Sequence, residues 1–260
     1  LFADRVSAMF TGDNNGGGNI VLTLKTKAQE VAWKQLTGNE RGVTRGSAIA
    51  LDPRTGAVQA MVSMPSYDPN PLASHDNEVA VKAYDKLIKA DNNPLLNRGV
   101  AEVYPPGSTF KVLVAAAALK SGIGKDDNIQ AGSSYTAPGA GQPITNVSAG
   151  TCPGSQVTLK EALTESCNTG FARLGVDLGA DAIKKEARDW GFEQEDLTVG
   201  NLTGGGLSVV ASRTGDIANP DGSTDEAALA QSSIGQNNVR MTTLQGALIA
   251  ATVANGGDQM

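Results

Sequence analysis

The chain has 260 residues, of which 40% are hydrophobic, and its formal net charge is −6. Such a length and composition can bury a sizeable core, as one large domain or two small ones. The acidic balance, without clustered Lys and Arg, excludes nucleic acid as the main partner, because neutralising phosphates requires such clusters.

Residues that commonly hold metals or act as imidazole bases are scarce. The chain has two cysteines, Cys152 and Cys167, and one histidine, His75. These are too few for a zinc site or a Ser-His-Asp triad, so neither a metal nor a cofactor is expected, and acyl-transfer chemistry would need another base. His75 has polar neighbours and is interpreted as a structural or exposed loop residue.

No segment is long and apolar enough to anchor the chain. The longest fully apolar run, residues 112–119, is too short to cross a bilayer, and no signal-like segment opens the sequence. Since the first residue is Leu1 and not methionine, we interpret the chain as a mature or shortened form that has lost an anchor or a targeting segment.

The first elements follow from local pattern. The glycine-rich stretch "GGGNIVLTLKT" leads into a predicted strand, and "KAQEVAWKQL" has the helical spacing of Val31, Trp33 and Leu36. Two β-rich runs, residues 48–51 and 57–62, are joined by "DPRTG", whose Pro and Gly suit a tight turn. They are expected to pair as an antiparallel hairpin.

Residues 78–90 then predict a helix, and breakers at 91–94 and 104–107 bracket a short irregular stretch. The Gly, Pro and Ser-rich segment "APGAGQPITNVSAGTCPGSQ" is expected to be a surface excursion. Thr158 and Glu161 in "TLKE" form a capping-box pattern that starts a helix leading to "ESCNTG". After a second polar excursion, "RMTTLQGALIAATVANGG" predicts an apolar helix with a glycine stop.

The segment "YPPGSTFKVLVAAAALKSG" places Ser108 three residues before Lys111, and a fully apolar run begins directly after the lysine. On a helix the two side chains share a face, and Pro106 and Gly107 place the serine at the helix start. Unpaired N–H groups there would stabilise an oxyanion formed at Ser108. Apolar neighbours would partly desolvate Lys111 and lower its pKa, which makes a neutral, proton-accepting amine accessible.

The same spacing also fits a serine that only caps the helix and a lysine whose charged end reaches solvent. Two observations favour the catalytic interpretation. No other serine has a lysine three residues on, and "SCN", residues 166–168, is the one S-x-N pattern of the sequence. Both patterns lie where a predicted helix meets a loop.

With these motifs the sequence resembles the penicillin-recognising acyl-serine transferases, which carry S-x-x-K and S-x-N in this chain order. The stretches "GSAIALDPRTGAVQAMVSMPSYDPN", "NRGVAEVYPPGSTFKV", "LTESCNTGFARLG" and "SIGQNNVRMTTLQGALIAATVANGG" extend the resemblance to class B penicillin-binding proteins, particularly actinobacterial ones, over nearly the whole chain. The resemblance implies an α/β (α+β) fold, with an antiparallel sheet packed on helices and an all-helical subdomain.

The resemblance further implies a peptidoglycan D,D-transpeptidase that is acylated by beta-lactams. Ser108 would be the acylated nucleophile, Lys111 its base, Ser166 the relay of a proton to the leaving amine, and Asn168 a ligand of the substrate's backbone amide. Implied partners are stem peptides, beta-lactams and proteins of cell-wall synthesis or cell division. The implied location is the extracytoplasmic face of the bacterial membrane, with an N-terminal anchor absent from this chain.

One family motif is missing. K-T-G follows the region that resembles "ATVANGG", and this chain stops at Met260 before reaching it. We therefore expect one transpeptidase domain over residues 1–260, truncated before the K-T-G strand and without the C-terminal strands of the sheet. "SRTG", residues 212–215, precedes "SIGQ" in a polar excursion and is interpreted as an ordinary loop, not as a substitute for K-T-G.

Cys152 and Cys167 are expected to form a disulfide, because a wall enzyme works where thiols oxidise and no other cysteine is present. Two buried free thiols are the alternative. Asn146 and Asn201 begin N-x-S and N-x-T patterns to which no function is given. Residues 169–170 are expected to shape the turn after the S-x-N motif.

Other functions remain open from the sequence. A D,D-carboxypeptidase would hand the acyl group to water, and a beta-lactamase would hydrolyse the drug. A non-catalytic sensor of beta-lactams or muropeptides would also keep both motifs. No E-x-x-x-N element of the class A deacylation type follows "SCN" in the polar excursions, which disfavours the beta-lactamase.

Overall fold

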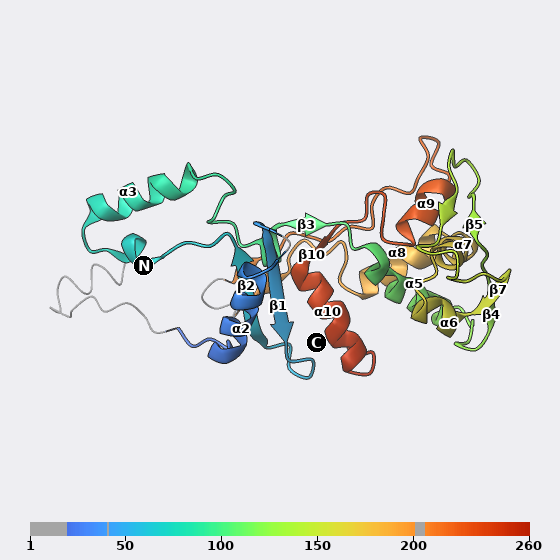
Figure 1. The fold of residues 1–260 in the computed structure, drawn as a ribbon, viewed down its shortest axis with the longest axis horizontal. Coiled ribbons are helices and arrows are strands. Elements are labelled where there is room, and N and C mark those ends of the chain that lie inside the picture. The colour runs from blue at the N-terminus through green and yellow to red at the C-terminus, as the bar shows by residue number, and fades with distance from the viewer. Residues whose placement is uncertain (1–19, 41, 201–205) are drawn as a thin grey trace.

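The computed structural model describes residues 20–40, 42–200 and 206–260 (Figure 1). The α-helices are α2 (Thr26–Thr37), α3 (Asn77–Ile88), α4 (Arg98–Ala101), α5 (Lys111–Lys120), α6 (Leu159–Thr164), α7 (Asn168–Leu178), α8 (Ala180–Asp189), α9 (Glu226–Ser232) and α10 (Thr243–Ala254). The strands are β1 (Gly46–Leu51), β2 (Val58–Met64), β3 (Val103–Tyr104), β4 (Asn128–Gln130), β5 (Ser134–Tyr135), β6 (Ile144–Thr145), β7 (Gln156–Thr158), β8 (Thr198–Val199), β9 (Leu207–Ser208) and β10 (Met241–Thr242). Two 3₁₀ turns are η1 (Asn70–Ala73) and η2 (Gly107–Phe110).

The predicted hairpin is confirmed. β1 and β2 pair antiparallel from Gly46 opposite Met64 to Ala50 opposite Ala60, with an irregular register between Ala50 and Leu51. In the described part of the chain this sheet has two strands, and α2, α4 and α10 pack against it. Figure 1 shows the hairpin between α2 and α10, with α3 extending away from it.

Most predicted helices are confirmed, and one predicted strand is wrong. Helices occur at 26–37, 77–88 and 243–254, close to the predicted ranges. Residues 20–25 form no strand, because they make one backbone–backbone bond with β2, from Lys25 N–H to Gln59 O, and one side-chain bond, from Thr23 Oγ1 to Val58 O. The glycines that precede this stretch lie outside the described residues. None of the helices in the described ranges is both long and apolar enough to span a bilayer.

A second lobe contains α5 to α9, on the opposite side of Figure 1 from α3. Its core joins apolar side chains of all these helices, including Leu113, Leu159, Phe171, Ile183 and Leu229. This lobe matches the expected helical subdomain, but it also contains the antiparallel pairs β4–β7 and β5–β6. These short strands come from the segment expected to be a surface excursion and its flanks, where the backbone groups of one stretch pair with those of another.

Candidate active site

The predicted nucleophile lies in a 3₁₀ turn that leads directly into a helix. Ser108 is exposed within η2, and α5 begins at Lys111. Side chains at i and i+3 eclipse in a 3₁₀ turn, so the two residues share a face as the spacing predicts. Phe110 anchors the turn, because its buried ring packs edge-on against Phe192 at a centroid distance of 5.6 Å.

Two glycines fix the start of the serine turn. Gly107 has a φ of 57° and donates its N–H to the Gly235 carbonyl at 2.9 Å. A Cβ at Gly235 would lie 1.9 Å from the Gly107 carbonyl oxygen, so no larger residue fits there without moving the turn. The "SIGQ" stretch therefore packs directly against the peptide that precedes Ser108.

Lys111 is fully buried, and its amine contacts four oxygens. Nζ lies 3.2 Å from Ser108 Oγ, 3.0 Å from Ser166 Oγ, 2.7 Å from the Ser166 carbonyl oxygen and 2.6 Å from Asn168 Oδ1. All four oxygens are uncharged. Desolvation by burial therefore lowers the pKa of Lys111 to about 8, as the apolar neighbours in the sequence predicted.

The S-x-N motif occupies a tight turn between α6 and α7. The predicted capping box at Thr158 and Glu161 is present and starts α6, which ends at Thr164. Ser166 has a φ of 54°, a left-handed conformation that is strained for serine and turns both its carbonyl and its hydroxyl toward Lys111. Asn168 opens α7. The turn thus brings two groups to a lysine that lies 55 and 57 residues earlier.

The predicted disulfide is present. Cys152 and Cys167 are bonded to each other, and both are buried. Cys167 is the middle residue of the S-x-N motif, so the bond ties the polar loop before β7 to the turn that carries Ser166 and Asn168.

Reduction of this disulfide is expected to slow the acylation of Ser108 that the resemblance implies more than it lowers the melting temperature. The bond closes a loop with a sequence separation of 15 residues, which is worth roughly 3 kcal/mol in the chain-entropy model. A small displacement of Asn168 acts directly on the reacting groups and can cost ~10-fold or more in rate. Thiol titration in denaturant, with and without reductant, followed by penicillin acylation kinetics and thermal melting, measures both effects.

A reoxidised sample of the same protein is the matched control and should recover its acylation rate. Two reactive thiols before reduction would contradict the disulfide itself. An unchanged acylation rate after complete reduction would show that the bond stabilises the fold without positioning the motif.

The "SRTG" stretch is engaged in structural contacts. Thr214 is buried, and its N–H and hydroxyl both donate to Glu193 Oε1, at 2.8 and 2.9 Å. Arg213 forms ion pairs with Glu193 and Glu195. Since its hydroxyl is already bonded within the fold, Thr214 is not free to bind a substrate carboxylate, which supports interpreting the stretch as an ordinary loop.

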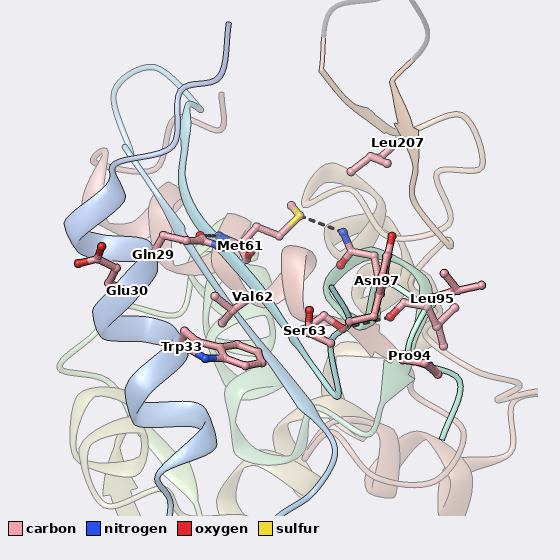
Figure 2. Close-up of a pocket in the computed structure, with 13 residues that line it drawn as sticks. Gln29, Glu30, Trp33, Met61, Val62, Ser63, Pro94, Leu95, Asn97 and Leu207 are labelled. Carbon is pink, nitrogen blue, oxygen red and sulfur yellow. Dashed lines mark hydrogen bonds between the residues drawn. The ribbon is translucent and has the colours of Figure 1, made fainter. Parts of the chain in front are cut away.

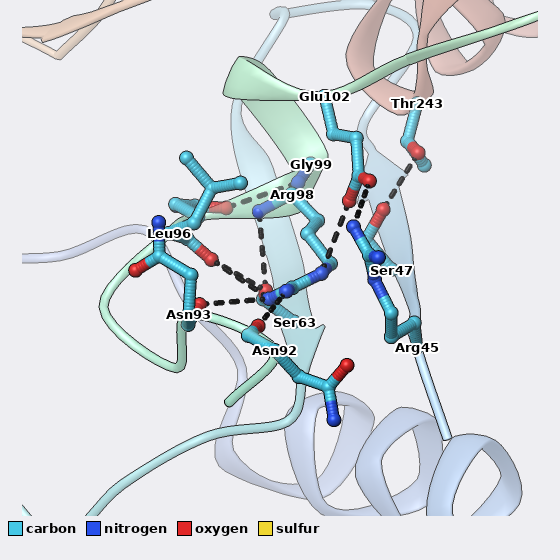
Figure 3. Close-up of polar contacts among 11 residues, drawn as sticks. Arg45, Ser47, Ser63, Asn92, Asn93, Leu96, Arg98, Gly99, Glu102 and Thr243 are labelled. Carbon is cyan, nitrogen blue, oxygen red and sulfur yellow. Dashed lines mark hydrogen bonds and ion pairs between the residues drawn. The ribbon is translucent and has the colours of Figure 1, made fainter. Parts of the chain in front are cut away.

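A buried arginine that the sequence analysis missed orders the segment before the serine. Figure 3 shows the Arg98 guanidinium donating to the carbonyls of Asn92, Asn93 and Leu96, with Glu102 on its other side. Arg98 Nε lies 3.0 Å from Glu102 Oε2. The spacing of four residues between Arg98 and Glu102 was the available signal, although such pairs usually lie on exposed helix faces.

Among the hollows formed by the described residues, two lie on the hairpin side of the molecule. One of about 620 Å³ is bounded by α2, β2 and residues 94–97, and Figure 2 shows Trp33, Met61 and Asn97 on its walls. The other, of about 510 Å³, includes Thr109 of the serine turn and apolar residues of β1 and α10 in its walls. Only the second adjoins the segment that carries Ser108.

The remaining candidates that the structure describes make no contact with the Lys111 amine. His75 is exposed in the loop before α3, as expected. Thr169 and Gly170 lie in the first turn of α7, where both are buried. Asn201 lies outside the described residues. Within the described ranges, no group of three or more His, Cys, Asp or Glu side chains is placed to hold a metal ion.

Comparison with known proteins gives a consistent result. The family model for the penicillin-binding protein transpeptidase domain matches residues 46–260. The peptidoglycan D,D-transpeptidase PbpA of Mycolicibacterium smegmatis is 41% identical over 261 residues, covering 100% of this chain and 51% of the relative. PbpA of Mycobacterium tuberculosis is 40% identical over the same length. The chain thus spans about half the length of these curated relatives.

Solved structures agree with the sequence comparison. Penicillin-binding protein A of M. tuberculosis, in its penicillin G acyl-enzyme complex, has a TM-score of 0.84 and 40% identity, covering 99% of this chain and 57% of that chain. PBP2 of Pseudomonas aeruginosa has a TM-score of 0.76 and 29% identity, covering 95% of this chain and 51% of that chain. The expected α/β fold is therefore confirmed.

Proposed function

The chain belongs to the transpeptidase family of class B penicillin-binding proteins, and we propose that the full-length protein is a peptidoglycan D,D-transpeptidase with Ser108 as its nucleophile. The observation that carries the proposal is the position of Lys111. Its buried amine contacts the hydroxyls of Ser108 and Ser166 and the side-chain oxygen of Asn168, without a charged partner among these groups.

The contacts of Lys111 can all be satisfied by a neutral amine whose lone pair faces a hydroxyl. The Ser166 carbonyl and Asn168 Oδ1, at 2.7 and 2.6 Å, carry no hydrogen and can only accept. They take the two N–H groups of a neutral amine. The lone pair is then left for Ser108 Oγ at 3.2 Å or Ser166 Oγ at 3.0 Å, either of which can donate its proton. This arrangement supports Lys111 as the base for Ser108.

In the proposed reaction, Ser108 Oγ attacks the carbonyl carbon of the penultimate D-alanine of a stem peptide while its proton passes to Lys111. The tetrahedral intermediate expels the terminal D-alanine, whose amine takes a proton from Lys111 by way of Ser166. An amine of a neighbouring strand then attacks the acyl-serine ester, and its proton returns to Ser108 as the new amide forms. Unpaired N–H groups of the serine turn would stabilise the oxyanion.

Substrates, partners and location belong to the same proposal. Stem peptides would be the natural substrates. Beta-lactams would acylate Ser108 by ring opening, and the former ring nitrogen would stay covalently attached to the acyl group instead of leaving. We also propose an N-terminal membrane anchor, an extracytoplasmic active site, partners in cell-wall synthesis or cell division, and a K-T-G strand beyond Met260 that completes the domain.

The proposal is tested with the full-length protein, a peptide ending in D-alanyl-D-alanine and an amine acceptor. We expect release of D-alanine together with an equal amount of the new amide, measured by chromatography and mass spectrometry. Release without amide would favour a carboxypeptidase, and rapid hydrolysis of penicillin would favour a beta-lactamase. A protein that neither releases D-alanine nor binds penicillin covalently would overturn the enzymatic proposal and favour a different role for the fold.

A further inference from the structure

The side-chain amide of Asn146 connects three segments around the S-x-N motif. Its Nδ2 donates to the carbonyls of Gly132 and Thr151, at 3.0 and 2.9 Å, and its Oδ1 accepts from the Thr169 N–H at 3.1 Å. Two carbonyls need the NH₂ group and one N–H needs the oxygen, so the partners fix the orientation of the amide. The engaged Nδ2 also leaves no room for a glycan at this N-x-S pattern.

Asn146 acts as the cap of α7. The first N–H groups of a helix lack partners within the helix and are usually bonded by the side chain of the capping residue. Cys167 occupies that position in α7, makes no side-chain cap and is committed to the disulfide. Asn146 supplies the missing acceptor to Thr169 from 23 residues earlier in the chain.

The residue before Asn146 holds the neighbouring side chain of the motif. The Thr145 carbonyl, in β6, accepts from Asn168 Nδ2 at 3.0 Å. This bond turns the other end of the Asn168 amide, Oδ1, toward Lys111 Nζ at 2.6 Å. Thr145 and Asn146 thus hold consecutive residues of α7, and the contact between Asn168 and Lys111 depends on both anchors keeping their spacing.

We propose that Asn146 is a positioning residue for acyl transfer, which holds the first turn of α7 so that Asn168 Oδ1 directs the amine of Lys111 toward the serine hydroxyls. This inference rests on the proposed function and adds a residue to it. Asn146 touches neither Ser108 nor Lys111, so its effect passes through Asn168.

The test uses the full-length protein with Asn146→Ala, and Ser148→Ala as the matched control. Ser148 is exposed in the same loop, and its replacement removes the same N-x-S pattern. It also removes a hydroxyl contact with Thr151 Oγ1, but it keeps the Asn146 side chain and the Thr151 carbonyl that Asn146 binds. We expect the second-order rate constant for penicillin acylation of the folded protein to fall ~10- to 100-fold in Asn146→Ala, because displacing a reacting group by about 1 Å slows a reaction by up to this factor. The rate constant should stay unchanged in the control.

A double-mutant cycle with Asn168→Ala separates positioning from a general loss of stability. If Asn146 acts through Asn168, Asn146→Ala adds no further loss of rate to the Asn168→Ala protein. The pH midpoint of acylation, set by Lys111, should also move in Asn146→Ala. A lower melting temperature with an unchanged rate and midpoint, or rate losses that simply add, would overturn the proposal.

If Asn146→Ala does not fold, Asn146→Asp replaces it. Aspartate keeps the acceptor for Thr169 and nearly the same volume, but it places an oxygen against the two carbonyls. A folded Asn146→Asp protein that acylates at the wild-type rate would also reject the positioning role. Failure of the proposed function looks different, because the unmodified protein would then not react with penicillin at all.

Discussion

Replacing Ser108 with alanine in the full-length protein is expected to abolish covalent labelling by penicillin. Ser108 is exposed, and its hydroxyl lies beside the amine of the buried Lys111. In the described part of the chain, no other exposed residue places a hydroxyl against that amine. Removing the nucleophile of an acyl-serine enzyme costs on the order of 10⁶-fold in turnover. Intact-mass measurement after incubation with penicillin should show one adduct on the unmodified protein and none on the variant.

Ser121→Ala is the control for this experiment. Ser121 lies at the other end of α5, exposed, with its hydroxyl bonded to the Ala117 carbonyl. Its replacement should leave the adduct unchanged. An adduct that persists in Ser108→Ala would place the nucleophile elsewhere, and the interpretation of Lys111 as its base would then fail as well.

Lys111→Arg is expected to be nearly inert although it keeps a positive charge. A guanidinium stays protonated at all working pH values and offers no acceptor, so it cannot take the serine proton. In the unmodified protein, burial lowers the pKa of Lys111 to about 8. Below that pH the amine is protonated and cannot accept, so the acylation rate should rise with pH through about 8 and level off above it.

Stopped-flow acylation with a chromogenic cephalosporin across this pH range measures the prediction. Because Lys111 is fully buried, the larger arginine could also disturb packing, and Lys111→Met serves as a second variant with an unbranched chain and no amine. Both variants should lose the rise with pH, and a melting curve checks that each is folded. A variant that retains the wild-type rate and its pH dependence would exclude Lys111 as the base.

The sequence by itself determined the features that depend on neighbours within a few residues. The prediction that Ser108 and Lys111 share a face was correct, although the structure forms a 3₁₀ turn at Ser108 where an α-helix was expected. Both helix types place residues i and i+3 on one face. The hairpin turn and the capping box at Thr158 were likewise local. The pairing of Cys152 with Cys167 followed from the extracytoplasmic location that the resemblance implies, together with there being two cysteines. The resemblance of the motifs supplied the remaining roles.

Only the tertiary structure decided which groups surround the lysine and what holds them. The contacts of Lys111 with Ser166 and Asn168 span more than 50 residues, and the cap that Asn146 gives to α7 comes from a loop that composition alone marked as irregular. The predicted strand at residues 20–25 was wrong because this stretch makes one backbone–backbone bond with β2, from Lys25, whereas a strand needs a continued ladder of such bonds. Such contacts depend on how distant segments pack against one another, and no spacing within one segment records that packing.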